Sequence, residues 1–484
     1  MLLSYPIILW VSTLGGLLGS LQFGYQLAVL NPSLHQALER LGLSEEAKSF
    51  YGSFVVSSVL AGALFGSLRA GNIADQIGPK KSTMLATIPF MLGTTVSSVA
   101  PNVFVLVVGR IIAGIGVGSS SVLVSRYLNE ISPVKLRGFL GSCNQLFINF
   151  GILMAFGLGL VYNRDDDAHV WSMEWWRGML LIGNVPSLLQ LVVMSVCPET
   201  PVWLLWNGLH LQASVSYRLL HGSVPEDVSI MQGHDPGEDE GTQEGLNLLS
   251  DGVDNTYGDY NNRRVKDKAD EVGYRVLLEK RYCRIMLLAS VIPVSQQLSG
   301  INIVILYGAE VMKLCGLSNP LTSNLILGVV NTAFTILSAF ILDRVGRKPV
   351  LVLSFFGMAV SLVLLSIALS FNASIWAFVS LLMYISFFGE GCGGVPWVYL
   401  AEILPDEIKG TAQALCTAVN WGANILVGAS FSFLLGSMGH LAGVFGLYAF
   451  FCTVSGIFCW SYMIETKKKS LHQVHQELMQ LGSE

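Results

Sequence analysis

The segment Gln296-Gln297-Leu298-Ser299-Gly300-Ile301-Asn302 places three amide side chains inside a stretch that is otherwise as apolar as lipid. An amide left unpaired in hydrocarbon costs several kcal/mol, about 4–8 kcal/mol on a cyclohexane scale. Three amides so close together therefore need partners. Each amide offers donors and an acceptor without a formal charge, which suits a neutral ligand whose hydroxyl groups both donate and accept. The segment predicts a binding site for such a ligand.

The spacing of these amides also predicts an interrupted helix. On a straight helix of about 3.6 residues per turn, Gln296, Gln297 and Asn302 fan over a wide arc. We therefore expect the helix to break or unwind at Gly300, as helices do where transporters build sites near the middle of a bilayer. The alternative is that the amides hold neighbouring helices together by hydrogen bonds. Three amides around a Ser-Gly break favour the binding site.

The composition is that of a membrane protein. Of 484 residues, 13% are charged and 52% are hydrophobic, whereas a soluble protein carries about 25% charged residues. The net charge of −5 is small and no basic patch is present, so we expect no nucleic-acid partner. No pair of the eight cysteines has metal-ligand spacing. We expect no metal and no cofactor, and we interpret Cys143, Cys416, Cys452 and Cys459 as small buried hydrophobic groups.

Apolar runs of about 20 residues, long enough to cross a bilayer, follow one another along the chain. They begin near residues 7, 51, 82, 103, 139, 178, 284, 321, 350, 375, 411 and 441. We therefore predict about twelve transmembrane helices in a bilayer. Basic residues gather in alternate loops, at Lys80-Lys81, Lys135 and Arg137, Arg344 to Lys348, Lys409 and Lys467 to Lys469, while an opposite loop carries Asp165 to Asp167. The positive-inside rule assigns the basic side, with both termini, to the cytoplasm.

A hydrophilic segment separates the sixth and seventh runs. Its acidic, Gly-rich middle at 234–241 is predicted to be disordered and its ends helical. We expect a solvated linker, with a regulatory or docking loop as the alternative. The predicted organisation is an N-terminal six-helix bundle at 1–197, a cytoplasmic linker at 198–281, a C-terminal six-helix bundle at 282–463 and a cytoplasmic tail at 464–484.

No signal or transit peptide is predicted, because the first charged residue is Glu39 and no basic region precedes the first apolar run. The chain begins almost inside that run, where we would expect a cytosolic leader. An N-terminal extension missing from the sequence is therefore one alternative.

The two halves repeat each other. Glu130-Ile-Ser-Pro133 with Arg137-Gly138 matches Glu402-Ile-Leu-Pro405 with Lys409-Gly410; Asp75, Gly78 and Lys80 match Asp343, Gly346 and Lys348; and Pro198-Glu199-Thr200 matches Ile464-Glu465-Thr466. These anchors occur in the same order at nearly the same offset. Six runs followed by six, as a same-direction repeat, is the layout of a two-bundle transporter.

The repeated anchors place acids and bases at the predicted cytoplasmic ends of helices. Glu130 or Glu402 would reach the Lys and Arg of the Asp-x-x-Gly loops, and we interpret the set as a clamp between the bundles that biases which side is open. The alternative is topology-setting charges and helix caps. The candidate gating residues are Asp75, Lys80, Glu130, Arg137, Glu199, Asp343, Arg347, Lys348, Glu402, Lys409 and Glu465.

These motifs resemble those of the sugar porter family of the major facilitator superfamily, the group of facilitative glucose transporters and proton-sugar symporters. Besides the opening segment, the resemblance rests on Gly109-Arg110, Glu130 with Arg137-Gly138, Trp176-Arg177, Pro198-Glu-Thr-Pro201, Asp343-Arg-Val-Gly-Arg-Lys348, Pro396-Trp397 and Glu465-Thr466. It covers nearly the whole chain. It implies an all-α membrane protein with the major facilitator superfamily fold.

The resemblance also implies a small neutral sugar as substrate, a hexose such as glucose. The residues implied to line its site are Gln145, Gln296, Gln297, Asn302, Asn331 and Trp397, with Asn420, Trp421 and Asn424 close by. Amides would bond the hydroxyls, and the Trp397 indole would cover the apolar face of the ring, with a packing role for Trp397 as the alternative. Gly391, Gly393 and Gly394 before Pro396 would keep that helix bendable, as the family's extracellular gate requires.

Some positions depart from the family's pattern. Gln76 and Pro79 stand where basic residues are usual, and Val202 stands where an arginine is usual. The carboxylate common near the sugar in animal glucose carriers falls on Gly389, with Glu390 one residue later. One residue turns a helix by about 100°, so we do not expect Glu390 to take over that contact unaided.

The first apolar run bears on proton coupling. Proton-coupled relatives carry Phe-Gly-Tyr-Asp there, with the aspartate facing the arginine that matches Arg110, whereas this chain has Phe23-Gly24-Tyr25-Gln26. Glutamine takes up no proton in the physiological range. We therefore predict a facilitative hexose transporter working by alternating access. The alternatives are a proton-coupled symporter and a sugar sensor on a transporter fold.

No enzyme is expected, because no nucleophile, base and orienting group can be assembled from the intramembrane residues. We expect a multi-pass protein of the plasma membrane, with the plastid envelope or another organelle membrane as the alternative.

Overall fold

The computed structural model describes residues 5–133, 136–162, 169–170, 173–222, 276–277, 279–317, 319–405 and 408–467, with residues 469, 473, 474 and 477 of the tail. The helices of the first half are α1 (Ile7–Ala28), α2 (Leu34–Arg40), α3 (Glu45–Ile77), α4 (Pro79–Leu85), α5 (Thr87–Ser98), α6 (Val103–Ile131), α7 (Arg137–Tyr162), α8 (Trp175–Ile182) and α9 (Asn184–Val196). Two short strands, β1 (His169–Val170) and β2 (Met173–Glu174), pair antiparallel before α8.

The second half has the same order of long helices. After the short helices α10 (Pro201–Trp206) and α11 (His210–His221) come α15 (Lys280–Leu298), α16 (Ile301–Leu314), α17 (Pro320–Val345), α18 (Arg347–Ser370), α19 (Ser374–Phe387), the π-helix η5 (Phe388–Cys392), α20 (Val395–Ile403), α21 (Lys409–Met438) and α22 (Leu441–Tyr462). α10 and α11 are helices at the start of the linker, as predicted. The acidic segment 234–241 and Asp165 to Asp167 lie outside the described residues.

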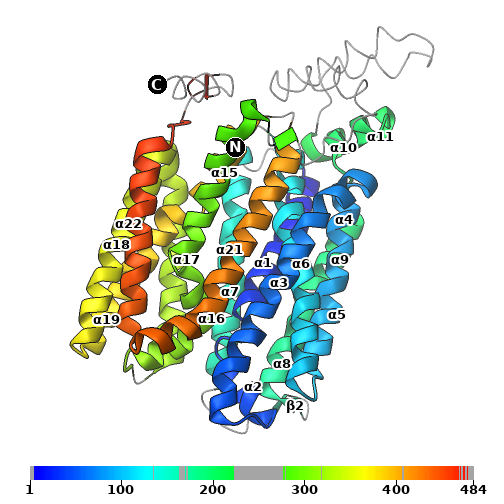
Figure 1. Cartoon of the computed structure of the whole chain (residues 1–484). Helices are drawn as coiled ribbons and strands as arrows, with labels where there is room; N and C mark the ends of the chain where they lie inside the picture. The colour runs from blue at the N-terminus through cyan, green and yellow to red at the C-terminus, as the bar shows by residue number, and fades with distance from the viewer. Residues whose placement is uncertain are drawn as a thin grey trace.

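Ten helical segments of the described chain are long and apolar enough to cross a membrane, and the bent pair α15–α16 makes eleven. α4 and α5, which meet at Ala86, supply one further crossing and pack beside α6 and α9. About twelve transmembrane helices are therefore confirmed. Figure 1 shows them as two bundles side by side, with α21 of the second bundle lying against α3 of the first.

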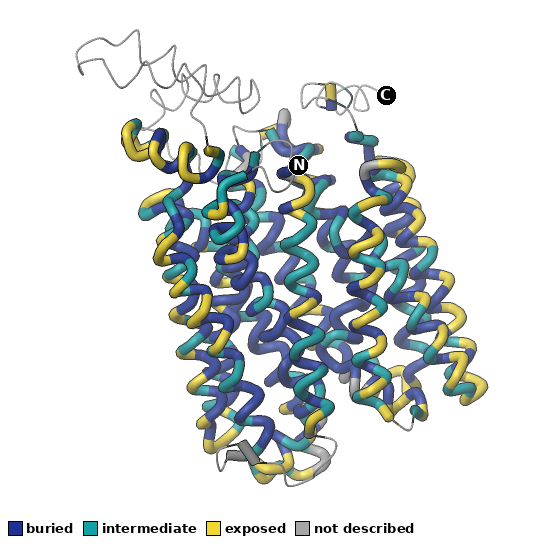
Figure 2. The backbone as a smooth tube through the Cα atoms, turned by 180° about the vertical axis from the view of Figure 1, so that it is seen from behind, coloured by how far each residue is buried: buried dark blue, intermediate teal, exposed yellow. Residues whose placement is uncertain are grey.

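The surface of the two bundles is apolar where a bilayer would touch it. Figure 2 shows exposed positions along the outer faces of the helices, over a buried interior. The exposed side chains include Phe104, Val192, Phe340 and Trp460, each more than 60% exposed. A soluble protein rarely leaves so much apolar surface in water, so this surface faces lipid.

Small residues bring helices of one bundle into backbone contact. A Cβ added at Gly114 of α6 would lie 2.1 Å from the carbonyl oxygen of Val59 in α3, and one at Gly118 would lie 1.9 Å from that of Ala63. Only glycine permits this approach, which is the usual way membrane helices gain packing energy without a hydrophobic effect between them. α3 and α6 are thus packed closely against each other within the first bundle.

α1 begins and α22 ends at the upper end of the bundles in Figure 1. The positive-inside rule assigns this end to the cytoplasm, and we call it the cytoplasmic end. The opposite end carries the α16–α17 connection and the β1–β2 hairpin.

Candidate functional site

The predicted break in the opening segment is confirmed. Gly300 has φ +85°, the left-handed conformation, and the axes of Tyr282–Leu298 and Ile301–Gly308 differ by 43°. A Cβ at Gly300 would lie 2.8 Å from the ring of Tyr448 in α22. Both the backbone conformation and the available space therefore require glycine here.

Replacing Gly300 by alanine is expected to destabilise the protein. The left-handed conformation costs an L-residue about 1–2 kcal/mol, and the Tyr448 ring must move in addition. We expect a melting temperature several degrees lower in detergent. Gly141→Ala is the matched control, because Gly141 is exposed on α7 and a Cβ there meets nothing within 4 Å. Equal melting temperatures for the two variants would contradict this role of Gly300.

The amides around the break contact one another and backbone carbonyl groups at the end of η5. Asn302 donates to Gln297 Oε1. Gln296 Nε2 lies 2.6 Å from the carbonyl oxygen of Cys392 and 3.1 Å from that of Gly393. Polar groups therefore gather around the break, and Gln296 connects the break to the η5 segment by hydrogen bonds. The alternative, that the amides hold neighbouring helices together by hydrogen bonds, therefore applies to the amide nitrogen of Gln296.

α21 supplies further polar groups to the same region. Asn420 Nδ2 donates to the carbonyl oxygen of Pro293 at 3.0 Å and lies 3.5 Å from Gln296 Oε1. Asn424 Oδ1 and Trp421 Nε1 are buried and have no hydrogen-bond partner among the residues that the structure describes. Trp397 is half-buried against the core of the second bundle. Buried polar atoms that lack protein partners are usually satisfied by water or a ligand.

Two residues predicted from different bundles come close to a common neighbour. Gln145 Nε2 of α7 and Asn331 Nδ2 of α17 each lie 3.4 Å from Asn149 Oδ1. Asn149 Nδ2 donates to Thr335 Oγ1 at 2.9 Å. Sequence reasoning missed Asn149, although it stands one helical turn after Gln145 and so shares its face. The candidate site therefore lies between the bundles.

An aromatic contact also crosses from one bundle to the other at this level. The rings of Phe23 in α1 and Trp421 in α21 lie 5.7 Å apart at an angle of 52°. Such tilted pairs stabilise by about 0.5–1.5 kcal/mol beyond their buried area. The site is thereby bounded by α1 and α7 on one side and by α15, α17 and α21 on the other.

The end of the bundles remote from the cytoplasm is joined by amides. Asn31, just after α1, donates to the carbonyl oxygen of Ile305 in α16 at 2.6 Å. Asn324 of α17 donates to Asn31 Oδ1 at 3.2 Å. These bonds connect the first bundle to the second on the outer side of the amide cluster. No motif of the sequence singled out Asn31 or Asn324.

Arg110 and Gln26 meet in the interior of the first bundle. Arg110 Nη1 donates to Gln26 Oε1 at 2.8 Å, and Nη2 donates to the carbonyl oxygen of Gln26 at 2.6 Å. Gln26 is fully buried and Arg110 is 1% exposed. A buried guanidinium is thus held by neutral oxygens at the position where a carboxylate would pair with it.

The charged anchors form matching networks in the two halves. Glu199 accepts from the backbone N–H of Lys80 at 2.8 Å, at the start of α4, and Glu465 accepts from the backbone N–H groups of Arg347 and Lys348 at 3.0 Å, at the start of α18. A carboxylate at a helix N-terminus satisfies unpaired donors and complements the helix dipole. The repeat seen in the sequence is therefore also a repeat of contacts.

The ion pairs of Glu130 and Glu402 that the structure describes lie within each bundle, and the clamp between bundles stays a prediction. Glu402 reaches Arg347 as expected, with Oε1 2.9 Å from Nη2, but both belong to the second bundle. In the first bundle, Arg126 pairs with Asp75 at 2.8 Å and with Glu130 at 2.7 Å. These charges pair within a bundle because neighbouring helices of one bundle place them next to each other at the cytoplasmic end. Arg126 was missed, although it stands four residues before Glu130 on one helix.

Other predicted gating residues are placed only in part. The side chains of Arg137, Asp343 and Lys409 lie outside the described residues. Thr200 and Thr466 complete the two networks by donating to Glu130 Oε2 and Glu402 Oε2, at 2.6 and 2.5 Å. The networks therefore tie each bundle to the segment that follows it in the chain.

Replacing Glu402 by glutamine removes one charge of a partly exposed pair. Such pairs contribute about 0–1 kcal/mol, so we expect the balance of open forms to shift by at most about fivefold. The readout is the rate at which a thiol reagent labels Cys283, an exposed cysteine near the cytoplasmic end of α15. The matched control is Glu477→Gln, which removes a carboxylate from the Lys469 pair in the tail. Identical labelling rates of Cys283 in the wild type and the Glu402 variant would show that the Glu402–Arg347 pair does not affect the balance between the open forms.

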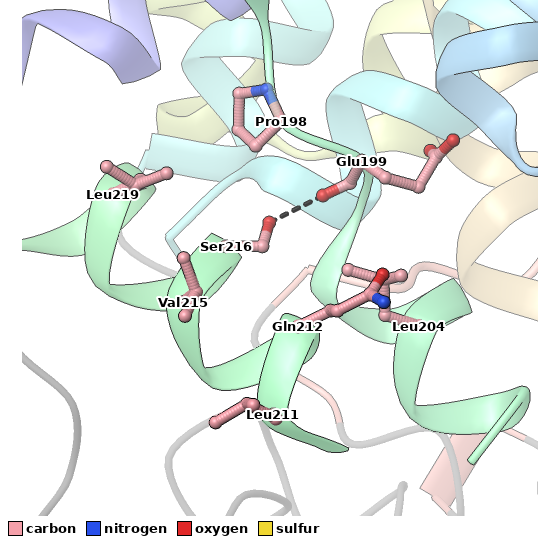
Figure 3. Close-up of a pocket in the computed structure, with 8 residues that line it drawn as sticks. All are labelled: Pro198, Glu199, Leu204, Leu211, Gln212, Val215, Ser216 and Leu219. Atoms are coloured by element: carbon pink, nitrogen blue, oxygen red, sulfur yellow. Dashed lines mark hydrogen bonds between the residues drawn. The ribbon is translucent and has the colours of Figure 1, made fainter. Parts of the chain in front are cut away.

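A separate cavity of about 290 Å³ lies outside the membrane part, between the end of α9 and the helices α10 and α11 (Figure 3). It is lined by Pro198, Glu199, Leu204, Leu211, Gln212, Val215, Ser216 and Leu219. Ser216 donates to the carbonyl oxygen of Glu199. Burial raises the pKa of the Glu199 carboxyl, against the backbone N–H groups of Lys80 and Thr200, which lower it. This cavity is distinct from the amide cluster.

Comparisons with known proteins agree with this geometry. A family model described as "Sugar (and other) transporter" matches residues 13–478. Plastidic glucose transporter 4 of Arabidopsis thaliana is 31% identical over 468 residues, covering 95% of this chain and 79% of that protein. The D-xylose-proton symporter of Escherichia coli (strain K12) is 30% identical over 494 residues, covering 96% and 94%. The solved structure of the proton:xylose symporter XylE bound to 6-bromo-6-deoxy-D-glucose matches with a TM-score of 0.78 at 28% identity, over 97% of this chain and 99% of that one.

Proposed function

This chain belongs to the sugar porter family of the major facilitator superfamily, and we propose that it is a facilitative hexose transporter that works by alternating access. The observation that carries the proposal is the cluster of neutral amides around the Gly300 break in the second bundle, where α21 packs against α3 of the first bundle. Amides without formal charge suit a sugar better than an ion. Glucose is the first substrate to test, because curated relatives are plastidic glucose transporters.

Gln297, Asn302, Asn331 and Asn424 are proposed to bind the sugar hydroxyls, and Trp397 to cover the apolar face of the ring. Gln145 and Asn420 complete the two sides of the site. Gln296 connects this site to the gate, because its amide nitrogen contacts the carbonyl groups of Cys392 and Gly393 where the π-helix ends. A π-helix is a frequent functional irregularity, and bending here would change the contact made by Gln296.

Contacts between the outer ends of the two bundles support alternating access. The bonds of Asn31 hold the outer ends of the bundles together in the conformation described here. Releasing these bonds while the opposite ends approach would expose the amide cluster to the other side. Sugar binding drives the exchange only through its differential affinity for the two conformations.

Uniport is proposed because Gln26 occupies the coupling position. A symporter needs a group that changes charge during the cycle, and Arg110 is offered neutral oxygens here. The xylose-proton relatives make proton symport the alternative. The plastidic relatives also support the plastid envelope, the alternative to the plasma membrane, as the location.

The experiment is uptake of radiolabelled glucose, fructose, xylose and a polyol by proteoliposomes containing the purified chain. We expect saturable uptake of at least one hexose, inhibited by an excess of the same unlabelled sugar. A sugar sensor would bind the sugar but show no time-dependent uptake. Binding is measured by the change in the protein's tryptophan fluorescence. Binding without uptake, or uptake of none of these compounds, would contradict the proposed function.

A further inference from the structure

Asn149 occupies a position between the bundles that the family resemblance did not assign. It is 2% exposed, on the face of α7 that packs against α17. Its nitrogen donates to Thr335 Oγ1 at 2.9 Å. Its oxygen receives two amide donors, one from Gln145 of its own bundle and one from Asn331 of the other, both at 3.4 Å.

These distances describe an acceptor that is shared and only loosely bound. N–H to O hydrogen bonds are shortest and strongest at about 2.7–3.2 Å, so two donors at 3.4 Å are incompletely satisfied. Asn331 Oδ1 is buried without a partner among the described residues. Gln145 and Asn331 can therefore form shorter hydrogen bonds with a ligand, while Asn149 provides them with a partner when no ligand is bound.

We propose that Asn149 takes the place of sugar hydroxyls in the empty transporter. Its amide has a donor and an acceptor, as a hydroxyl has, and it stands between the two predicted sugar-binding amides. When sugar is absent, Asn149 gives these amides a partner as the bundles close. When sugar is present, its hydroxyls take the donors of Gln145 and Asn331, and Asn149 contributes less.

This inference rests on the proposed function and adds a role in one step of its cycle. Net uptake requires the empty carrier to reorient, whereas exchange of labelled for unlabelled sugar uses loaded carriers in both directions. Closing the bundles over unpaired amides is costly. Loss of Asn149 should therefore slow reorientation of the empty carrier more than reorientation of the sugar-loaded carrier.

The test compares net uptake into sugar-free proteoliposomes with exchange at equal sugar on both sides, using glucose or the hexose transported best. For Asn149→Val we expect the ratio of exchange to net rate to rise about fivefold, which corresponds to about 1 kcal/mol, with a nearly unchanged KM for exchange. Thr335→Val removes the oxygen that orients Asn149, and we expect it to raise the ratio in the same direction. Asn149→Thr, which introduces a hydroxyl that can both donate and accept, should restore part of the wild-type ratio.

Ser142→Ala is the control on the same helix, because among the described residues the Ser142 hydroxyl bonds only to the carbonyl oxygen of Gly138, within α7. Its ratio should equal that of the wild type. Equal slowing of net uptake and exchange by Asn149→Val, or no change in either, would overturn the inference. Absence of both processes in the wild type would instead refute the proposed function, so the two failures are distinguishable.

Discussion

Replacing Gln297 by leucine is expected to lower hexose uptake at sub-saturating sugar by about tenfold or more. Gln297 is 6% exposed and pairs with Asn302 across the Gly300 break. Leucine removes a sugar partner and leaves the Asn302 nitrogen unpaired, and leaving a buried polar group unpaired costs about 1–3 kcal/mol. Each 1.4 kcal/mol is about a tenfold change in affinity. Initial uptake over a range of sugar concentrations should show the loss mainly as a raised KM.

The matched control is Gln212→Leu, which makes the same chemical change in α11, outside the membrane part. It should transport as the wild type does. Both variants need an unchanged elution volume in size-exclusion chromatography, so that lost uptake reflects the site and not the fold. A folded Gln297→Leu protein with a wild-type KM would remove Gln297 from the sugar site.

Replacing Gln26 by aspartate is expected to make uptake depend on pH by several-fold between about pH 5 and 8. The new carboxylate, on a side chain one methylene shorter, would face Arg110, whose Nη1 now lies 2.8 Å from Gln26 Oε1. Its ionised form would pair with the guanidinium and so favour the conformation described here as pH rises. Its protonated form loses that pairing and releases the conformation as pH falls. A group that binds protons differently in the two conformations links protons to the sugar cycle.

Gln26→Asn is the control, because it has nearly the same shape as the aspartate variant and carries no charge. Its uptake should be as insensitive to pH as that of the wild type. If all three proteins show the same pH profile, the Arg110 position has no part in coupling. A strong pH dependence already in the wild type would point to another titrating group, with Glu390 the first to test.

Much of the fold follows from one-dimensional patterns. Apolar runs and the repeated anchors predicted two bundles, and left-handed Gly300 followed from amides that cannot share one face of a straight helix. The Arg110–Gln26 contact followed from the family's pairing of the same two positions. Local geometry or the family resemblance was sufficient to predict each of these features.

The partners of the charged anchors could not be predicted in the same way. Matching motifs show that two loops are alike, but not which helices neighbour each other, so the pairs that Glu130 and Glu402 make within their own bundles were not specified. Asn31 and Asn324 are single amides far apart in the chain, and only tertiary packing brings them together. Asn149, by contrast, was accessible from its spacing to Gln145.

The central claim is that sugar moves passively through this chain, and the final level of glucose in proteoliposomes under an inward proton gradient tests it directly. The account predicts that internal glucose rises to the external concentration and stops there, with the same final level after a protonophore is added. Glucose concentrated several-fold above the external level, and released by the protonophore, would contradict it and establish a proton-coupled symporter.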